Sequence, residues 1–247
     1  MSNNLIIKVF RFIERRVLYQ YFIRKTTKKN IIGIGLQKTG TTSLYIFMSW
    51  LGYNCKHYVP EIFNKKWLGS SPICKQNELL DLSMPNLSSY IHKYDFLDDN
   101  PFGKPDVIHK IINEWPNTRF ICTVREKEDW IHSVIKHINQ NYYQEQFEYR
   151  KQNYENYDVK NDMILTANNI GMLEYMYGIP YKGISRSFLS EYWDNHQKFV
   201  SKLHEEFPEN VIMVDVNNYE ETTIKICNFL KMRTPLFFQF PHAKKSN

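Results

Sequence analysis

Hydrophobic residues along the chain fall into short runs of strand length that alternate with longer runs of helical period. The run Ile31–Ile34 is rich in isoleucine, and Thr118–Val124 is the strongest run of strand type after it. Strands that alternate with helices predict a parallel sheet joined by right-handed crossovers. Further strands are predicted in Gly52–Tyr58, Tyr94–Asp98 and Val211–Val214, and helices in Ser43–Leu51, Lys75–Leu82, Pro105–Trp115, Glu126–Ile138, Glu191–Phe207 and Asn218–Lys231.

Two long stretches show neither period. Val59–Ser89 is irregular apart from the predicted helix at Lys75–Leu82, and Asn139–Ser190 carries many tyrosines among charged and amide side chains. A chain of 247 residues has room for one α/β domain with a substantial core. We therefore expect one domain over residues 31–247, with residues 139–190 as an insertion.

Residues 1–30 form a distinct N-terminal segment, in which apolar residues recur at roughly helical spacing between eight lysines and arginines. No run approaches the ~20 apolar residues of a membrane span, and the continuous apolar centre of a signal peptide is absent. Two interpretations stay open. We favour a helix that packs on the domain, because the apolar and basic faces are only loosely separated. The other is a basic amphipathic helix in weak contact with an anionic membrane surface.

The turn after the first predicted strand carries the clearest chemical signal. Gly35–Leu44 reads Gly-Leu-Gln-Lys-Thr-Gly-Thr-Thr-Ser-Leu and leads directly into a predicted helix. Loop amides and the positive end of a helix dipole form an anion-binding concavity there, and Lys38 adds a full positive charge. The run is not a Walker A loop, because Thr41 stands where that motif has its lysine.

This run resembles the 5′-phosphosulfate loop of the sulfotransferases that use 3′-phosphoadenosine 5′-phosphosulfate (PAPS). The resemblance implies a three-layer α/β sandwich with a central parallel sheet, similar to P-loop NTPases. It also implies transfer of a sulfuryl group from PAPS, the co-substrate, to a hydroxyl or amine of a carbohydrate or small molecule, without a metal ion. Lys38 would neutralise charge on the leaving oxygen. The predicted donor-binding residues of the loop are Gln37, Lys38, Thr39, Gly40, Thr41, Thr42 and Ser43.

A second signal follows the strand at Thr118–Val124. Arg125 leaves this strand, and Ser133 comes eight residues later on the next predicted helix. The pair resembles the 3′-phosphate site of the same sulfotransferases. A guanidinium binds phosphate through two charge-assisted hydrogen bonds, and the serine adds a further donor. We therefore expect Arg125 and Ser133 to bind the 3′-phosphate of PAPS.

A general base should take the proton of the acceptor. His57, Asp98 and Asp99 are rival candidates at predicted strand ends, and Glu61 is a weaker one. Ligands of parallel sheets bind beyond these carboxyl ends. Because successive side chains on a strand point to opposite faces, we expect at most one of Asp98 and Asp99 to face the site. The spacing does not decide between the candidates.

Composition narrows the class of partner. The net charge of +6 suits an anionic ligand, and no cluster of Lys and Arg is dense enough to wrap a nucleic acid duplex. The four cysteines have no zinc-ligand spacing, so we expect neither a metal site nor a disulfide framework, as in a cytoplasmic protein. The pattern indicates no oligomeric state.

Two departures from the PAPS pattern leave alternatives open. The glycine-rich C-terminal segment of cytosolic sulfotransferases is missing, since the last glycine is Gly183. Lys244 and Lys245 would supply positive charge there, or they belong to a solvated tail, which we favour. Val211–Val214 ends at Asp215 like a Walker B strand, so a P-loop nucleotide kinase or nucleotidase is the alternative enzyme. A third possibility is a nonenzymatic protein that binds a nucleotide or docks on a membrane. The tyrosine-rich stretch would form a lid over the acceptor.

Overall fold

The computed structural model of the protein describes residues 11–14, 30–59, 86–99, 101–138, 177 and 184–242. The chain divides into two compact units. The first comprises residues 1–59, 89–125 and 198–247, and the second comprises residues 60–88 and 126–197. The predicted division into an arm, a domain and a lid remains a prediction, because most of residues 1–30 and 139–190 lie outside the described residues.

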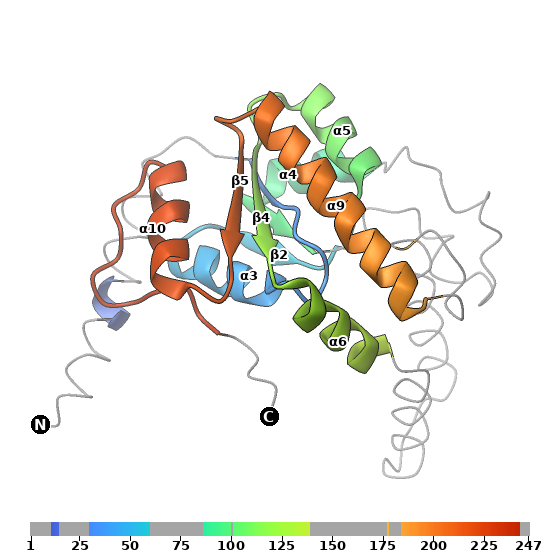
Figure 1. Ribbon diagram of the computed structural model, residues 1–247. Coiled ribbons are helices and arrows are strands. Elements are labelled where there is room, and N and C mark those ends of the chain that lie inside the picture. Colours follow the sequence, from blue (N-terminus) through green and yellow to red (C-terminus); the bar gives the residue numbers. More distant parts are fainter. Residues whose placement is uncertain are drawn as a thin grey trace, which may run out of the picture. The chain divides into compact units, whose positions relative to one another are not determined.

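A parallel sheet forms the centre of the first unit (Figure 1). Its five strands in the described chain lie in the order β2-β3-β1-β4-β5. The α/β class with a central parallel sheet between helices is thereby confirmed. The strands are β1 (Ile31–Gly33), β2 (Cys55–His57), β3 (Phe96–Asp98), β4 (Arg119–Val124) and β5 (Val211–Asp215).

Helices α3 (Thr41–Trp50) and α10 (Tyr219–Phe229) cover one face of this sheet. Their buried side chains meet in one cluster that includes Phe47 of α3 and Ile226 of α10. Phe47 is fully buried, and burial of such a side chain contributes about 1.5–3 kcal/mol. On the other face lie α5 (Pro105–Glu114) and the residues of α9 that belong to this unit, where His109 and Phe199 make a ring contact (Figure 1).

The ends of α3 explain its length. It begins at Gly40, which has φ 100°, and it ends before Gly52, which has φ 91°. The Gly52 N–H donates to the Ser49 carbonyl and the Tyr53 N–H to the Met48 carbonyl. These two bonds form a Schellman motif, which needs a left-handed residue at the glycine position.

The second unit holds α6 (Lys127–Ile138) and the first part of α9 (Arg186–Glu206). The sequence pattern predicts that α9 starts at Glu191, but it begins at Arg186. The Ser185 hydroxyl accepts the N–H of Phe188 and so caps the helix earlier than the hydrophobic period shows. The sequence pattern does not predict helix α4 (Leu87–Lys93), because its seven residues are too few to show a helical period. The predicted helix at residues 75–82 lies outside the described residues.

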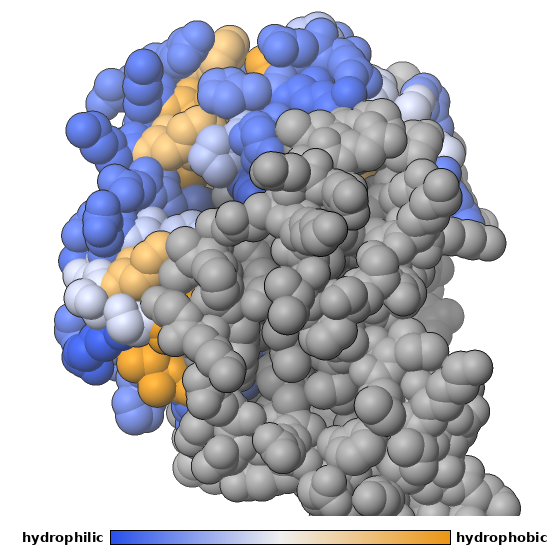
Figure 2. All heavy atoms as spheres, turned by 90° about the vertical axis from the view of Figure 1, so that its right-hand side faces the viewer, coloured by the Kyte–Doolittle hydropathy of each residue, from blue (hydrophilic) through white to orange (hydrophobic). Residues whose placement is uncertain are grey.

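The exposed surface is mostly polar where it can be seen. Figure 2 shows the described residues of one face as largely hydrophilic, with hydrophobic residues in small separate areas. Among the helices of the described ranges, none is long and apolar enough to cross a membrane. The large hydrophobic side chains of these ranges lie mainly in the core.

Candidate active site

The carboxyl edge of the sheet brings the predicted base candidates together. His57 is the last residue of β2, Asp98 is the last residue of β3, and the register of the two parallel strands pairs them directly. Arg125 follows the end of β4. Parallel strands end at one edge of a sheet, so these residues share the edge where ligands of such sheets bind.

His57 and Asp98 form a hydrogen-bonded pair. The Nδ1 atom of His57 lies 2.7 Å from Oδ1 of Asp98. When Asp98 is ionised its carboxylate can only accept, so in that state the ring proton lies on Nδ1 and Nε2 is an acceptor. The side chain of His57 retains 23% exposure, whereas that of Asp98 has none. An acceptor can therefore reach the imidazole but not the buried carboxyl group.

Two opposing effects set the protonation of Asp98. Burial raises the pKa of the Asp98 carboxyl to about 7, and the hydrogen bond from His57 opposes this rise. Its second oxygen, Oδ2, has no hydrogen-bond partner among the described residues. A Cβ atom on Gly33 would stand 2.5 Å from the Asp98 Cβ, so only glycine on β1 leaves room for this side chain.

Asp99 corrects the expectation that at most one of the two carboxylates faces the site. Its Oδ2 lies 3.4 Å from Nε2 of His57, on the opposite side of the ring from Asp98. Asp99 has φ 68°, outside the extended region. The alternation of side chains holds only for extended backbone, and this left-handed residue turns both carboxylates toward one imidazole.

The loop between β1 and α3 has a tightly determined shape. The Thr39 hydroxyl is fully buried, donates to the Leu36 carbonyl at 2.6 Å and lies 2.8 Å from the Thr123 hydroxyl of β4. A Cβ on Gly35 would stand 2.1 Å from the Thr123 hydroxyl oxygen, and one on Gly40 would stand 2.8 Å from Val216. Thr39 therefore holds the loop in place, and its contact with a donor stays a prediction.

Lys38 is held in a sparsely populated backbone conformation. Four non-glycine residues in the described ranges have positive φ, and three of them, Lys38, Tyr58 and Asp99, lie in or next to the candidate site. Such conformations persist where the surrounding structure determines them, and they gather at functional sites. This distribution supports a functional role for the loop.

The start of α3 is suited to an anion. Gly40 has no side chain to cap the helix, and the first turn contains no acidic residue. The positive end of the helix dipole therefore meets no negative side chain of its own first turn. The Oγ1 atom of Thr42 lies 3.5 Å from Nε2 of His57, so the helix start and the histidine adjoin each other.

The other predicted residues fall in both units. Gln37 and Lys38 of the loop are half-buried, while Thr41 and Ser43 of α3 are buried. Arg125 is half-buried in the first unit, and Ser133 is half-buried on α6 in the second unit. Among the described residues, no group of three or more His, Cys, Asp and Glu side chains is placed to hold a metal ion. Glu61 lies outside the described residues.

The sequence pattern does not identify the residues that support the site. Gly33 makes room for Asp98, Thr123 holds Thr39, and the ring of Tyr45 lies 5.3 Å from that of His57. One sequence signal does point to Thr123, because it is a hydroxyl residue inside an otherwise apolar strand.

Comparison with known proteins identifies the family of the chain. A family model described as a sulfotransferase domain matches residues 30–247. A relative from Aspergillus versicolor, described as Ava biosynthesis cluster protein M, is 25% identical over 108 residues. That match covers 42% of this chain and 41% of the relative, so the chain spans less than half of the relative's length. Because the family model covers most of the chain, including the loop and the edge described above, the protein belongs to the sulfotransferase family.

Proposed function

We propose that this sulfotransferase takes the sulfuryl group from PAPS and transfers it to a hydroxyl or amine of a small molecule or carbohydrate. One observation carries the proposal: Nε2 of His57 lies 3.5 Å from Thr42 at the start of α3. The atom suited to take the acceptor's proton therefore adjoins the helix terminus suited to the anionic donor.

On the acceptor side, His57 acts as the general base. Its Nε2 takes the proton of the acceptor hydroxyl or amine while the acceptor oxygen or nitrogen forms a bond to sulfur. The bond between sulfur and the bridging oxygen of the 5′-phosphate breaks, and adenosine 3′,5′-bisphosphate leaves. Asp98 fixes the ring through Nδ1 and stabilises the imidazolium that forms. Asp99, 3.4 Å from Nε2, stabilises the same charge.

On the donor side, the loop binds the phosphosulfate group. The start of α3 and the hydroxyls of Thr41, Thr42 and Ser43 hold the 5′-phosphate, with Gln37 beside them. Lys38 neutralises the negative charge that builds up on the leaving oxygen, as preorganised cations do in related group transfers. Arg125 and Ser133 bind the 3′-phosphate, which distinguishes PAPS from ATP and AMP.

A small-molecule acceptor agrees with the description of the relative as a biosynthesis cluster protein. The alternative of a P-loop kinase finds less support. Asp215, its candidate Walker B residue, is exposed, and its carboxylate accepts the N–H of Asn217 within the turn after β5. This hydrogen bond is typical of an aspartate that stabilises a turn.

The test is an assay of group transfer with two donors. The protein is incubated with sulfur-labelled PAPS and a panel of phenols, amines and glycans, and in parallel with γ-labelled ATP and Mg²⁺. The proposal expects label from PAPS in at least one acceptor and none from ATP, with the transfer lost in His57→Gln. Transfer from ATP without transfer from PAPS would contradict it and support the kinase.

A further inference from the structure

An exposed apolar surface lies where the two ends of the described chain meet. Phe12 and Ile13 of the N-terminal segment are 62% and 43% exposed, and Leu236 and Phe237 of the C-terminal segment are 67% and 37% exposed. Large hydrophobic side chains that are exposed together mark an interaction surface, whereas single ones are ordinary. We call these four residues with Arg11 the terminal patch.

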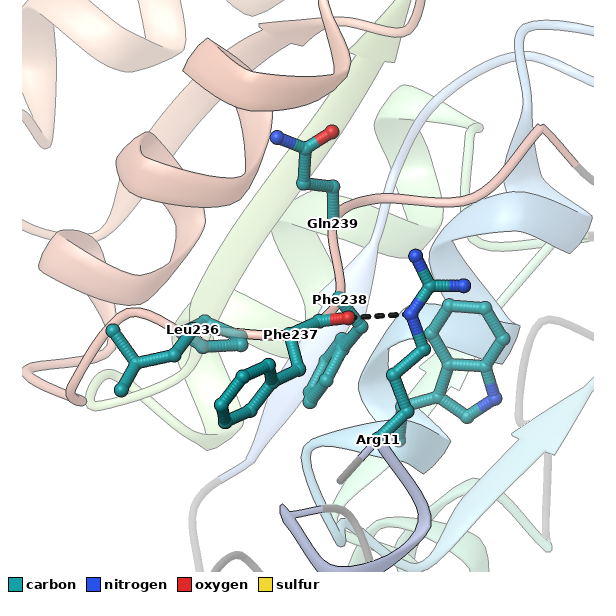
Figure 3. A pocket seen from close by; sticks show the side chains of 7 residues that line it. Arg11, Leu236, Phe237, Phe238 and Gln239 are labelled. Atoms are coloured by element: carbon teal, nitrogen blue, oxygen red, sulfur yellow. Dashed lines mark hydrogen bonds between the residues drawn. The ribbon is translucent and has the colours of Figure 1, made fainter. Parts of the chain in front are cut away.

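Hydrogen bonds hold the two halves of the terminal patch together. The carboxylate of Glu14 accepts the N–H of Leu236 at 2.8 Å and that of Phe237 at 2.9 Å. Glu14 is buried, with only 5% of its surface exposed. Arg11 Nε donates to the Phe237 carbonyl at 2.6 Å (Figure 3). The patch is therefore a built feature of the first unit.

The patch is hollowed as well as apolar. A cavity of about 440 Å³ lies against it, lined by Arg11, Trp50 and residues 235–239. In Figure 3 the guanidinium of Arg11 lies beside this cavity, and the side chains of Leu236 and Phe237 project away from their backbone. Apolar groups and a cation thus share one surface.

The charge of the chain is concentrated in the segment that builds the patch. Residues 1–30 contain eight lysines and arginines and one acidic residue, Glu14. Their net charge is +7 against +6 for the whole chain, so the remaining residues together carry −1. The one acidic residue, Glu14, accepts two backbone N–H groups with its carboxylate, and every other charged side chain of residues 1–30 is positive.

We propose that the terminal patch docks the protein on an anionic lipid bilayer. The interface of such a bilayer accepts apolar side chains at the headgroup boundary and attracts lysine and arginine. A second copy of the chain fits less well, because two segments of +7 would repel each other. The family match begins at residue 30, so Arg11–Glu14 lies outside the region that the family model matches.

Docking in this way leaves the candidate active site accessible. Trp50 beside the cavity is the last residue of α3, whereas Thr41 and Thr42 of the site begin it. Ten residues of α-helix span about 15 Å. The patch and the donor loop therefore lie at opposite ends of α3.

The test is co-sedimentation of the full chain with vesicles of phosphatidylcholine, with and without phosphatidylserine. We expect binding only to the vesicles with phosphatidylserine, and release as salt is raised. Leu236→Asp should weaken binding at least tenfold, since it removes an apolar contact and adds repulsion. Arg11→Gln should weaken it about fivefold, the factor expected for one basic residue at the surface.

Ile224→Asp is the matched control, because Ile224 is 41% exposed on α10, outside the patch. It should bind vesicles like the wild type. Binding of adenosine 3′,5′-bisphosphate serves as the check of folding for all three variants. The proposal fails if phosphatidylserine does not increase vesicle binding of the wild type, or if Leu236→Asp and Ile224→Asp bind vesicles equally. It also fails if the wild type forms dimers, or binds an acidic protein, instead of binding vesicles, and Leu236→Asp abolishes that association.

Discussion

Replacing Asp98 by asparagine tests the most specific feature of the site. The change keeps the size of a fully buried side chain but removes the charge that accepts the Nδ1 proton of His57 at 2.7 Å. An asparagine amide can instead donate to Nδ1. The ring proton would then move to Nε2, and the imidazole could no longer act as a base.

The size of the effect follows from this contact. A hydrogen bond to a charged group contributes roughly 1.5–3 kcal/mol, which corresponds to about 10- to 150-fold in rate. Loss of a general base costs about 10²–10⁴-fold. We therefore expect Asp98→Asn to lower kcat about 10²-fold or more, with little change in the affinity for adenosine 3′,5′-bisphosphate.

The pH profile supplies a second readout. The raised pKa of Asp98, about 7, means that the pair with His57 holds an extra proton up to neutral pH. The wild-type kcat/KM should rise with pH up to about 7 and then level off. In Asp98→Asn the residual activity should no longer show this limb, because the titrating carboxyl group is gone and Nε2 carries the ring proton.

Stability should respond in the opposite sense to activity. Because the pKa of Asp98 rises from 3.8 in the unfolded chain to about 7 in the fold, the group stabilises the fold below about pH 4 and loses this contribution as pH rises to 7. From pH 4 to pH 8, the unfolding free energy of the wild type should therefore fall relative to that of Asp98→Asn by roughly 4 kcal/mol at most.

The assays are sulfuryl transfer and urea unfolding across this pH range. Asp95→Asn is the matched control, because Asp95 lies just before the same strand and its carboxylate accepts the N–H of Asn54. It should change kcat little. Near-normal turnover in folded Asp98→Asn, or a pH limb that persists in it, would refute the reasoning about the pair.

Three further predictions concern the loop and its neighbours. Lys38→Ala should lower turnover by about 10²-fold while donor affinity, measured by titration, suffers less, and Lys38→Arg should restore part of the turnover. Gly33→Ala should lower kcat in the transfer assay, because the added Cβ would stand 2.5 Å from that of Asp98. Gly40→Ala and Gly52→Ala both place alanine at positive φ, which costs about 1–2 kcal/mol of unfolding free energy, and Gly40→Ala should cost more because its Cβ would stand 2.8 Å from Val216. Only Gly40→Ala should also weaken nucleotide binding in calorimetry.

The strands and long helices were predictable from the sequence, because each buries a periodic face. Val211–Val214 and Pro105–Trp115 appear as β5 (Val211–Asp215) and α5 (Pro105–Glu114), with ends shifted by one residue. Hydrophobic periodicity does not predict the start of a helix that a capping side chain determines, and it does not reveal very short helices. The cap at Ser185 and the seven-residue helix α4 are such cases.

The sequence indicates the candidate base residues but not their arrangement. The sequence offered His57, Asp98 and Asp99 as rivals, and the structure joins them around one imidazole. Their contact depends on β2 pairing with β3 in a register that places His57 opposite Asp98. It also depends on the left-handed backbone of Asp99. Neither the strand order nor the φ angle of a single residue can be predicted from the periodicity of the sequence.

Binding of adenosine 3′,5′-bisphosphate, compared with AMP, tests the central claim most directly. A PAPS enzyme needs a dedicated site for the 3′-phosphate, and Arg125 at the end of β4 is its proposed anchor. Calorimetric titration without metal should show that the wild type prefers the bisphosphate at least tenfold, about 1.4 kcal/mol. Arg125→Ala should lose most of that preference while its affinity for AMP changes little. Equal affinity of the wild type for the bisphosphate and for AMP or ATP would contradict the use of PAPS.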